Sequence, residues 1–217
     1  LGAAESGVCP AGDRHEHPRL DRGVQRWLEH AVSEVTSASP SAQAYQVHLF
    51  SDITRERELR EELRHLANHD VLTGVANRRR IVERLQEVAL APERPDRRIG
   101  VLFCDIDTLK AINDSHGHSV GDEVLTAVAE RLVGAVRSAD EVGRMGGDEF
   151  VVLLDELTSE EDLRLVAEKL RAEVSCQVTV DGQPIDVSAS IGAALMGPGE
   201  DPREALRRAD AALLQAK

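Results

Sequence analysis

The chain of 217 residues has 41 % hydrophobic and 30 % charged residues, which is typical of a soluble globular protein with one medium domain and a smaller part. A net charge of −13 and an aromatic content of 2 % exclude the basic or base-stacking surface of a nucleic-acid-binding protein, so a phosphate-bearing ligand would need metal ions or a local basic cluster. Three unevenly spaced cysteines favour unpaired thiols in a reducing cytoplasm, and the sequence predicts neither a signal peptide nor a membrane-spanning segment.

The first quarter of the chain predicts a flexible segment and a pair of strands. Residues 1–19 mix glycine, proline, histidine and charged residues without periodicity, which favours a flexible segment. Residues 24–35 and 45–54 alternate apolar and polar side chains, the period of half-buried strands, and their short connection predicts an antiparallel pair. The second strand ends in Asp-Ile-Thr before a charged helix, which resembles the last strand of PAS sensor domains. We therefore expect residues 20–54 to be the C-terminal part of a PAS-like sensor.

A charged helix is predicted over residues 55–67. Leu59, Leu63 and Leu66 recur at helical spacing, so they form a stripe on one face while the charged side chains face water. The stripe fits a short dimerising coiled coil, and it fits equally well a helix that packs on its own chain. We expect a signalling or linker helix, with both arrangements open.

Helices and strands alternate from residue 68 to the end of the sequence. Residues 99–107 form a continuous apolar run that ends in acids, which is typical of a central strand. Residues 177–195 predict a hairpin or strand pair. Apolar side chains at helical spacing predict helices that carry Ile81 and Leu85, that span residues 120–136, and that begin near Ser159 and at Asp201. This order predicts one mixed sheet covered by helices.

A turn with the sequence RMGGDEF, residues 144–150, lies between two apolar stretches that can pair as a hairpin. Gly146 and Gly147 suit a tight turn because positive φ costs glycine nothing. Asp148 and Glu149 repel each other on such a turn unless a cation or a substrate is present. The alternative interpretation is an ordinary acidic surface turn.

A second pair of acids, Asp105 and Asp107, ends the predicted central strand. If the hairpin neighbours this strand, Asp148 and Glu149 reach the same place. Oxygen ligands without cysteine or histidine suit magnesium or manganese. The alternative is that Asp105 or Asp107 caps the following helix, and both roles can coexist because there are two acids.

Polar residues follow this strand. Lys110 comes directly after the acids, and the backbone amides around it turn into a helix, so both can meet a phosphate. Asn113 and Asp122 flank a predicted loop that contains Gly117 and Gly121. A carboxylate can accept two hydrogen bonds from guanine that adenine does not offer on that edge, so Asp122 would select guanine. Turn formation is the alternative explanation of these polar residues.

Five segments occur in order and at fitting spacing: HDVLTGVANRR, DIDTLKAINDSHGHSVGDEVL, RMGGDEF, SASIGAAL and ADAALLQAK. Together they resemble the GGDEF family of diguanylate cyclases over residues 68–217. The resemblance implies an α+β, ferredoxin-like fold of the nucleotidyl-cyclase type, a mixed sheet flanked by helices, preceded here by the N-terminal strand pair and the linker helix. It implies condensation of two GTP molecules into cyclic di-GMP and two pyrophosphates, with Mg²⁺ (Mn²⁺ being possible) as the cofactor.

The resemblance also implies roles for matching residues. The metal ligands would be Asp105, the Ile106 carbonyl, Asp148 and Glu149. Catalysis would rest on Asp105, Asp148 and Glu149, the last as a metal ligand or as the base that deprotonates the attacking 3′-hydroxyl. The residues expected to bind substrate are Thr108, Leu109, Lys110, Asn113, Asp122, Gly146, Gly147 and Lys217. Arg137 and Asp140 match an RxxD site for inhibitory product.

One domain would hold one GTP, so the reaction requires a symmetric homodimer. The alternative to an enzyme is a non-catalytic receptor for GTP or cyclic di-GMP, and retention of both acids in the turn favours catalysis. A cyclase that makes another cyclic nucleotide is a third possibility, against which Asp122 argues. For Arg137 and Asp140, the alternative is a simple surface ion pair.

Overall fold

The computed structural model describes residues 14–21, 23–36, 44–90, 98–157, 159–197 and 199–217. The chain divides into two compact units, one up to His65 and one from Leu66 onward. Each unit is described by itself. Among the helices in the described ranges, none is long and apolar enough to cross a membrane.

The N-terminal unit is a three-stranded antiparallel sheet followed by a helix. The strands β1 (Arg14–Asp21), β2 (Val24–Thr36) and β3 (Ala44–Asp52) lie in the order β1-β2-β3. Helix α1 (Thr54–Asn68) starts directly after β3, because the carboxylate of Asp52 accepts hydrogen bonds from the amide and the hydroxyl of Thr54 at 3.0 and 2.6 Å. Arg57 of α1 stacks over the ring of Trp27 in β2 at 3.7 Å from the ring centroid.

The predicted antiparallel pair is confirmed as β2 and β3, and strand β1 adds to it, which corrects the prediction of a flexible segment over residues 1–19. Residues 14–21 form a strand in continuous register with β2, while the part of the prediction before residue 14 lies outside the described residues. Every side chain of β1 is exposed, so no apolar alternation marks the strand in the sequence. Strand β1 forms because its backbone hydrogen-bonds to β2, and the side-chain pattern of β1 itself gives no indication of that pairing.

The C-terminal unit is built on a five-stranded mixed sheet with the order β10-β5-β7-β6-β4. Strand β5 (Arg98–Ile106) is central, between β10 (Ala189–Met196) and β7 (Glu149–Leu157), and both pairings are antiparallel. Strand β6 (Glu141–Gly146) pairs with β7 in a hairpin, and the short β4 (Ala76–Asn77) adds to β6 in parallel. The predicted α+β class and mixed sheet are confirmed.

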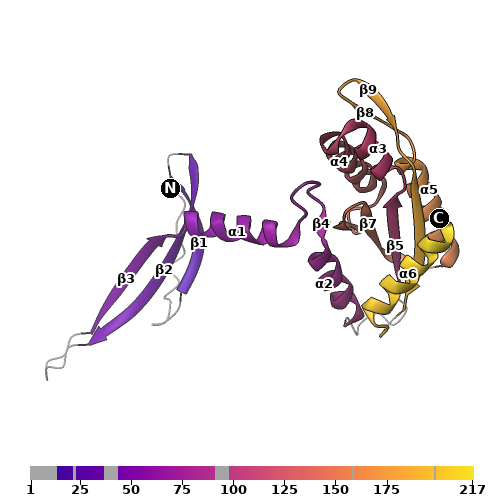
Figure 1. Cartoon of the computed structure of the whole chain (residues 1–217). Helices are drawn as coiled ribbons and strands as arrows, with labels where there is room; N and C mark the ends of the chain where they lie inside the picture. The colour runs from indigo at the N-terminus through magenta and orange to yellow at the C-terminus, as the bar shows by residue number, and fades with distance from the viewer. Residues whose placement is uncertain (1–13, 22, 37–43, 91–97, 158, 198) are drawn as a thin grey trace. The chain divides into compact units, whose positions relative to one another are not determined.

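Helices cover both faces of this sheet (Figure 1). Helices α2 (Arg78–Ala89) and α6 (Pro202–Ala216) pack on one face, and α4 (His118–Ala135) and α5 (Glu160–Val174) pack on the other. Strand β5 supplies both cores in alternation: Leu102 and Cys104 face α4 and α5, while Val101 and Phe103 face α2 and α6. Burial of both faces explains why β5 reads as an unbroken apolar run.

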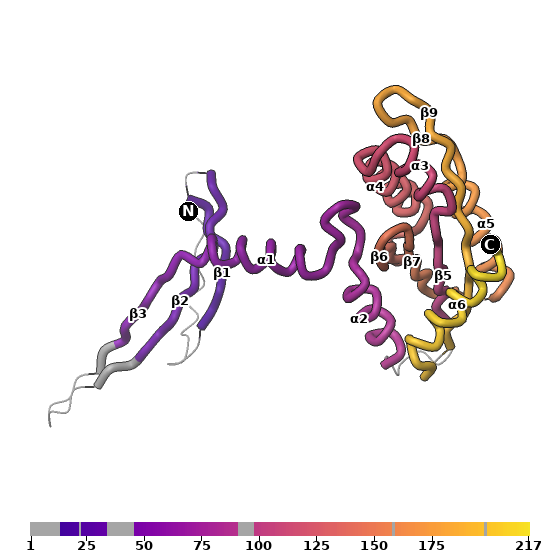
Figure 2. Tube along the Cα trace, in the orientation of Figure 1, coloured from indigo at the N-terminus to yellow at the C-terminus, as the bar shows by residue number. Residues whose placement is uncertain are grey.

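Two segments differ in detail from the predicted elements. The predicted loop before residue 120 is helical: α3 (Leu109–His116) and α4 are separated by Gly117 alone, whose φ of +88° lies in the region that favours glycine. The segment of residues 177–195 divides into a separate hairpin, β8 (Gln177–Val180) and β9 (Gln183–Asp186), and the edge strand β10. The hairpin lies beside α4 (Figure 2).

Candidate active site

The predicted acids meet at one end of the central strands. Asp105 near the end of β5 is the direct cross-strand partner of Glu149 at the start of β7. The amide of Ile106 donates to the carbonyl of Asp148 at 3.2 Å, which holds the turn against the end of β5. Asp105 is 8 % exposed and is the only buried charged residue in the described part of the chain. Two segments more than forty residues apart in sequence therefore place three carboxylates together, as the sequence predicted.

The turn between β6 and β7 depends on its two glycines and on one arginine. Gly146 and Gly147 have φ values of +144° and +55°, which L side chains rarely adopt. Arg144 donates from Nε and from its terminal nitrogen to the carbonyl of Gly147 at 3.0 and 2.7 Å. Its other terminal nitrogen pairs with Asp70 at 3.1 Å. Asp70 is fixed in turn by the amide and the hydroxyl of Thr73.

Arg144 and Asp70 are site residues that the sequence analysis did not single out. Asp70 lies in the HDVLTG segment and Arg144 in the RMGGDEF segment, but the two residues are 74 positions apart in sequence and no sequence pattern links them. The side chain of Arg144 is only 12 % exposed. The pair ties the segment after α1 to the acidic turn.

Lys217 brings a positive charge to the acids from the end of α6. Its ammonium group lies 2.7 Å from Oδ1 of Asp105, and the C-terminus lies beside the end of β5 (Figure 2). The hydrogen bond to Asp105 raises the pKa of Lys217 above its usual value, so the lysine stays charged. Helix α6 can lie this close because it packs against Gly192 of β10, where a Cβ atom would meet the backbone of α6 at 2.1 Å.

The concentration of negative charge is evident in Glu149. Partial burial raises the pKa of its carboxyl, and the charges of Asp105 and Asp148 raise it further. Asp210 of α6 acts in the same direction, and Lys217 opposes it. Asp210 is a second acid that the sequence analysis did not include. Such a cluster attracts cations, because repulsion among the carboxylates falls when a positive ion is shared.

The donor set suits a hard divalent ion, although the structure contains no preformed protein cage. In the described ranges, no three side chains of His, Cys, Asp or Glu are arranged to hold a metal ion. Magnesium is commonly bound through one or two carboxylates plus substrate phosphates, so Asp105 and its neighbours on the turn fit it. Asp107 is engaged elsewhere: both its oxygens accept from the hydroxyl of Ser190 at 3.0 Å.

The segment after β5 divides into core and surface positions. Lys110 is exposed, while the side chain of Leu109 is 7 % exposed and packs in the core, so only its backbone could meet a ligand. The hydroxyl of Thr108 accepts from the amide of Ser188 at 3.2 Å. Of these predicted substrate-binding residues, Lys110 has the free side chain.

Asn113 and Asp122 come from consecutive helices, not from the two sides of a loop. The side-chain oxygen of Asn113 in α3 is buried and has no hydrogen-bond partner in the structure as described. It lies against Gly121 in the first turns of α4, one residue before Asp122. Asp122 is exposed and lines a shallow pocket of about 320 Å³ together with Leu72. Leu72, which is 38 % exposed, is a further pocket residue that the sequence analysis did not identify.

Arg137 and Asp140 form a closed turn at the end of α4. One oxygen of Asp140 accepts from the amide of Arg137 at 2.9 Å and the other from the amide of Asp155 at 3.0 Å. The side chain of Arg137 is exposed, and both residues line a cavity of about 720 Å³ with Lys169 of α5. The carboxylate therefore binds backbone amides, which neither the product-site prediction nor the ion-pair alternative anticipates.

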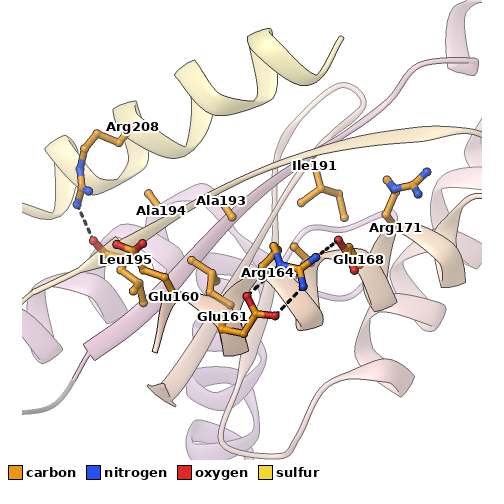
Figure 3. A pocket seen from close by; sticks show the side chains of 12 residues that line it. Glu160, Glu161, Arg164, Glu168, Arg171, Ile191, Ala193, Ala194, Leu195 and Arg208 are labelled. Atoms are coloured by element: carbon orange, nitrogen blue, oxygen red, sulfur yellow. Dashed lines mark hydrogen bonds and ion pairs between the residues drawn. The ribbon is translucent and has the colours of Figure 1, made fainter. Parts of the chain in front are cut away.

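A separate groove of about 670 Å³ lies between α5, β10 and α6, away from the acids (Figure 3). Arg164 pairs with Glu161 and Glu168 along the wall formed by α5, and Arg208 donates to the carbonyl of Leu195 in β10 at 2.6 Å. No residue predicted for the site lies in this groove. Arg208 pairs with Glu200 outside the groove lining.

Comparisons with known proteins identify the family of the C-terminal part of the chain. The family model described as "Diguanylate cyclase, GGDEF domain" matches residues 67–217. A bifunctional diguanylate cyclase/cyclic di-GMP phosphodiesterase of Pseudomonas aeruginosa, MucR, is 43 % identical over 157 residues, which are 72 % of this chain and 23 % of that protein. The diguanylate cyclase DgcP of the same species is 34 % identical over 98 % of this chain and 30 % of its own length. The chain thus spans less than a third of either relative.

A solved structure shows the same architecture. The coiled coil and GGDEF domain of DgcB from Caulobacter crescentus, in complex with c-di-GMP, matches with a TM-score of 0.68 and 30 % identity. The match covers 75 % of this chain and 86 % of that one.

Proposed function

The chain belongs to the family of diguanylate cyclase GGDEF domains, and on that premise we propose that it condenses two molecules of GTP into cyclic di-GMP. The single observation that carries the proposal is the convergence of Asp105, Asp148 and Glu149 with Lys217 at the end of β5. Acids and a lysine at one point can bind both a divalent ion and the triphosphate that neutralises it. Keeping both acids of the turn favours an enzyme over a receptor.

Each half of the reaction is an in-line displacement at phosphorus. The 3′-hydroxyl oxygen of one GTP forms a bond to the α-phosphorus of the other, the bond from that phosphorus to the bridging oxygen breaks, and pyrophosphate leaves with the electron pair. Glu149 would accept the hydroxyl proton, and partial burial and the neighbouring acids raise the pKa of its carboxyl, which makes it a stronger base. Lys217 and Lys110 would hold the triphosphate as point charges.

The divalent ion would be held by Asp105, the Ile106 carbonyl and Asp148, with Glu149 as the remaining candidate ligand. When bound, magnesium or manganese lowers the pKa of the attacking hydroxyl and neutralises charge on the leaving pyrophosphate. The protein would position the carboxylates that bind the ion. The two glycines of the turn leave room for the nucleotide, and Arg144 holds the turn in place through the carbonyl of Gly147.

Guanine would be read by Asn113 and Asp122. The buried side-chain oxygen of Asn113 lacks a partner within the described chain, and an unpaired buried oxygen is stabilised by a ligand that donates a hydrogen bond to it. Asp122 would accept from the ring N–H and amino group of the base, and Leu72 would offer an apolar surface to its ring.

The reaction needs two copies of the domain, because each copy carries one set of these residues. We propose a homodimer with two-fold symmetry, in which each GTP presents its 3′-hydroxyl to the other. Leu59, Leu63 and Leu66 of α1 are 41, 66 and 53 % exposed, so their stripe is available to a second copy. The PAS-like origin of the N-terminal strands stays a prediction, as does a cytoplasmic location. A sensor unit there would control whether the half-sites meet.

Product inhibition would use Arg137 and Asp140. Cyclic di-GMP offers guanine edges and phosphates that an exposed arginine can address in a bidentate manner. The cavity beside Arg137 has Lys169 and several acids on its wall, so the contact with an anionic ligand would come from the exposed Arg137 at its edge. Because Asp140 binds the backbone amides of Arg137 and of Asp155 in β7, its contribution would be to hold the turn that carries Arg137 against the sheet.

The test is product formation from GTP and Mg²⁺, measured by mass spectrometry over a range of protein concentrations. We expect cyclic di-GMP, with a specific activity that rises with concentration as dimers form. Asp148→Ala and Glu149→Ala should abolish product, while Glu173→Ala, an exposed acid of α5, should not. Binding of GTP without product, even after fusion to a dimerising helix, would favour the receptor instead.

A further inference from the structure

A glycine within helix α4 requires an explanation that the backbone does not supply. Gly121 lies in the first turns of α4 and is buried, and its φ is not in the positive region that favours glycine, unlike that of Gly117. Alanine is the better helix former at such a position, because glycine loses more conformational freedom on folding. We therefore expect that a group outside the helix occupies the space that a side chain at residue 121 would need.

The space next to Gly121 is taken by Asn113. A Cβ atom on Gly121 would lie 1.9 Å from the side-chain oxygen of Asn113, 2.9 Å from its Cγ and 3.4 Å from its nitrogen. These three are the nearest heavy atoms, and all belong to that carboxamide. A side chain at residue 121 would thus displace the end of Asn113 before it disturbed any backbone.

The same carboxamide carries the unpartnered buried oxygen. A buried oxygen without a partner is unfavourable in the free protein, so the surrounding structure must hold it there. Gly121 bounds its position on one side and is followed directly by Asp122. The close approach of α3 and α4 at this glycine therefore places the Asn113 oxygen against the residue that precedes Asp122.

We propose that Gly121 is a positioning residue for base specificity: its missing side chain leaves the space that the Asn113 carboxamide occupies against α4, one residue before Asp122. The inference rests on the proposed guanine-reading role of these two residues. A methyl group at residue 121 would rotate or push Asn113 away and leave Asp122 where it is. The protein would then keep the triphosphate contacts and lose part of its discrimination among bases.

The same helix provides a matched control. Gly134 is also inside α4, but it is exposed, and apart from its chain neighbours and the backbone of its own helix no atom of the described chain lies within 4 Å of the position of its Cβ. Gly134→Ala therefore adds the same methyl group to the same helix without touching Asn113. It should stabilise the helix, because alanine is the better helix former, and leave nucleotide binding unchanged.

The first measurement is nucleotide binding to the full chain, with GTP, ITP and ATP as competitors of a fluorescent GTP analogue. ITP lacks the 2-amino group of guanine and so reports on its recognition. We expect Gly121→Ala to weaken GTP binding by roughly tenfold and ITP binding by less, as Asn113→Ala would, because a lost hydrogen bond to the base is worth about that factor. Combining both substitutions should be no worse than Asn113→Ala alone. Wild-type affinity in Gly121→Ala, or additive losses in the double variant, would overturn the proposal.

The second measurement is thermal unfolding without nucleotide. It tests whether a side chain at residue 121 meets Asn113, and this test holds even if the chain does not prefer GTP. In the Asn113→Ala background the obstructing carboxamide is gone, so Gly121→Ala should raise the unfolding midpoint as Gly134→Ala does. In the wild-type background it should lower the midpoint or leave it unchanged. If Gly121→Ala is equally destabilising in both backgrounds, another contact explains the glycine. Absence of GTP preference in the wild type would instead count against the proposed function.

Discussion

Replacing Asp70 with asparagine tests whether one arginine holds the acidic turn in position. Arg144 reaches from Asp70 to the carbonyl of Gly147, on the turn that carries Asp148. Asparagine keeps the shape of the side chain and can still accept the hydrogen bonds from Thr73. It removes the negative charge that orients the guanidinium.

The magnitude follows from the burial of the pair. The side chains of Arg144 and Asp70 are 12 and 26 % exposed, so the pair is largely but not wholly shielded from water. A hydrogen bond to a charged group contributes about 1.5–3 kcal/mol, and partial exposure places this one near the lower end. We expect a loss of about 1–2 kcal/mol, which lowers the unfolding midpoint by about 2–8 °C.

The effect on catalysis should exceed the effect on stability. A displacement of about 1 Å in a catalytic group can reduce a rate by roughly a hundredfold. Since the turn carries two of the three acids, we expect Asp70→Asn to lower kcat by about ten- to a hundredfold. The KM for GTP should change little, because Asn113 and Asp122 lie on other elements.

The matched control is Glu141→Gln, measured by the same product assay and thermal scan. Glu141 also lies in β6 and also pairs with arginine, accepting from Arg80 at 3.1 Å, but it faces α2 and not the turn. It should lose comparable stability and keep kcat. An Asp70→Asn variant with the wild-type kcat, or a Glu141→Gln variant equally inactive, would refute the positioning role of Arg144.

Three further outcomes are expected. Burial raises the pKa of Asp70, but hydrogen bonds from Thr73 and Arg144 outweigh burial and lower the pKa below 3.8. The stabilisation from this carboxylate is therefore present above that pH and is lost as the pH falls through the folded pKa. When the free energy of unfolding is measured against pH, Asp70→Asn should lack this loss, and a curve identical to that of the wild type would contradict the assignment. Gly192→Ala should cost about 1–3 kcal/mol or more in urea denaturation, since the new Cβ would meet backbone atoms of α6 at 2.1 and 2.2 Å, and wild-type stability would be inconsistent with this packing. Lys217→Ala should strengthen Mn²⁺ binding measured without nucleotide, because Asp105 loses its internal cation, and weaker binding would show that the two do not compete.

The central part of the site could be predicted from local sequence. An apolar run ending in acids is a buried strand whose end is polar, and a Gly-Gly pair between apolar stretches is a hairpin turn. The structure has both, in adjacent strands, with Asp105 opposite Glu149. Local patterns suffice here because strand burial and turn conformation depend on the residues themselves.

Other features depend on contacts between distant segments. Asp107 is as acidic as Asp105, yet Ser190 of β10 binds it, 83 residues away. Asp140 was predicted to contact product, and its oxygens are bound by backbone amides, one of them from Asp155. Strand β1 pairs without any apolar pattern of its own. In each case the role depends on which distant segment makes the contact, and the type of residue alone does not predict it.

The sequence by itself determined the class of the fold, the motifs and the types of group available for chemistry, because periodicity and turn preferences act over a few residues. Only the tertiary structure decided which acid meets Lys217, that Arg144 is held by Asp70, and that Gly121 makes room for Asn113. Those outcomes depend on distances between elements far apart in the chain. Such distances arise from packing the helices on the sheet, so no local pattern contains them.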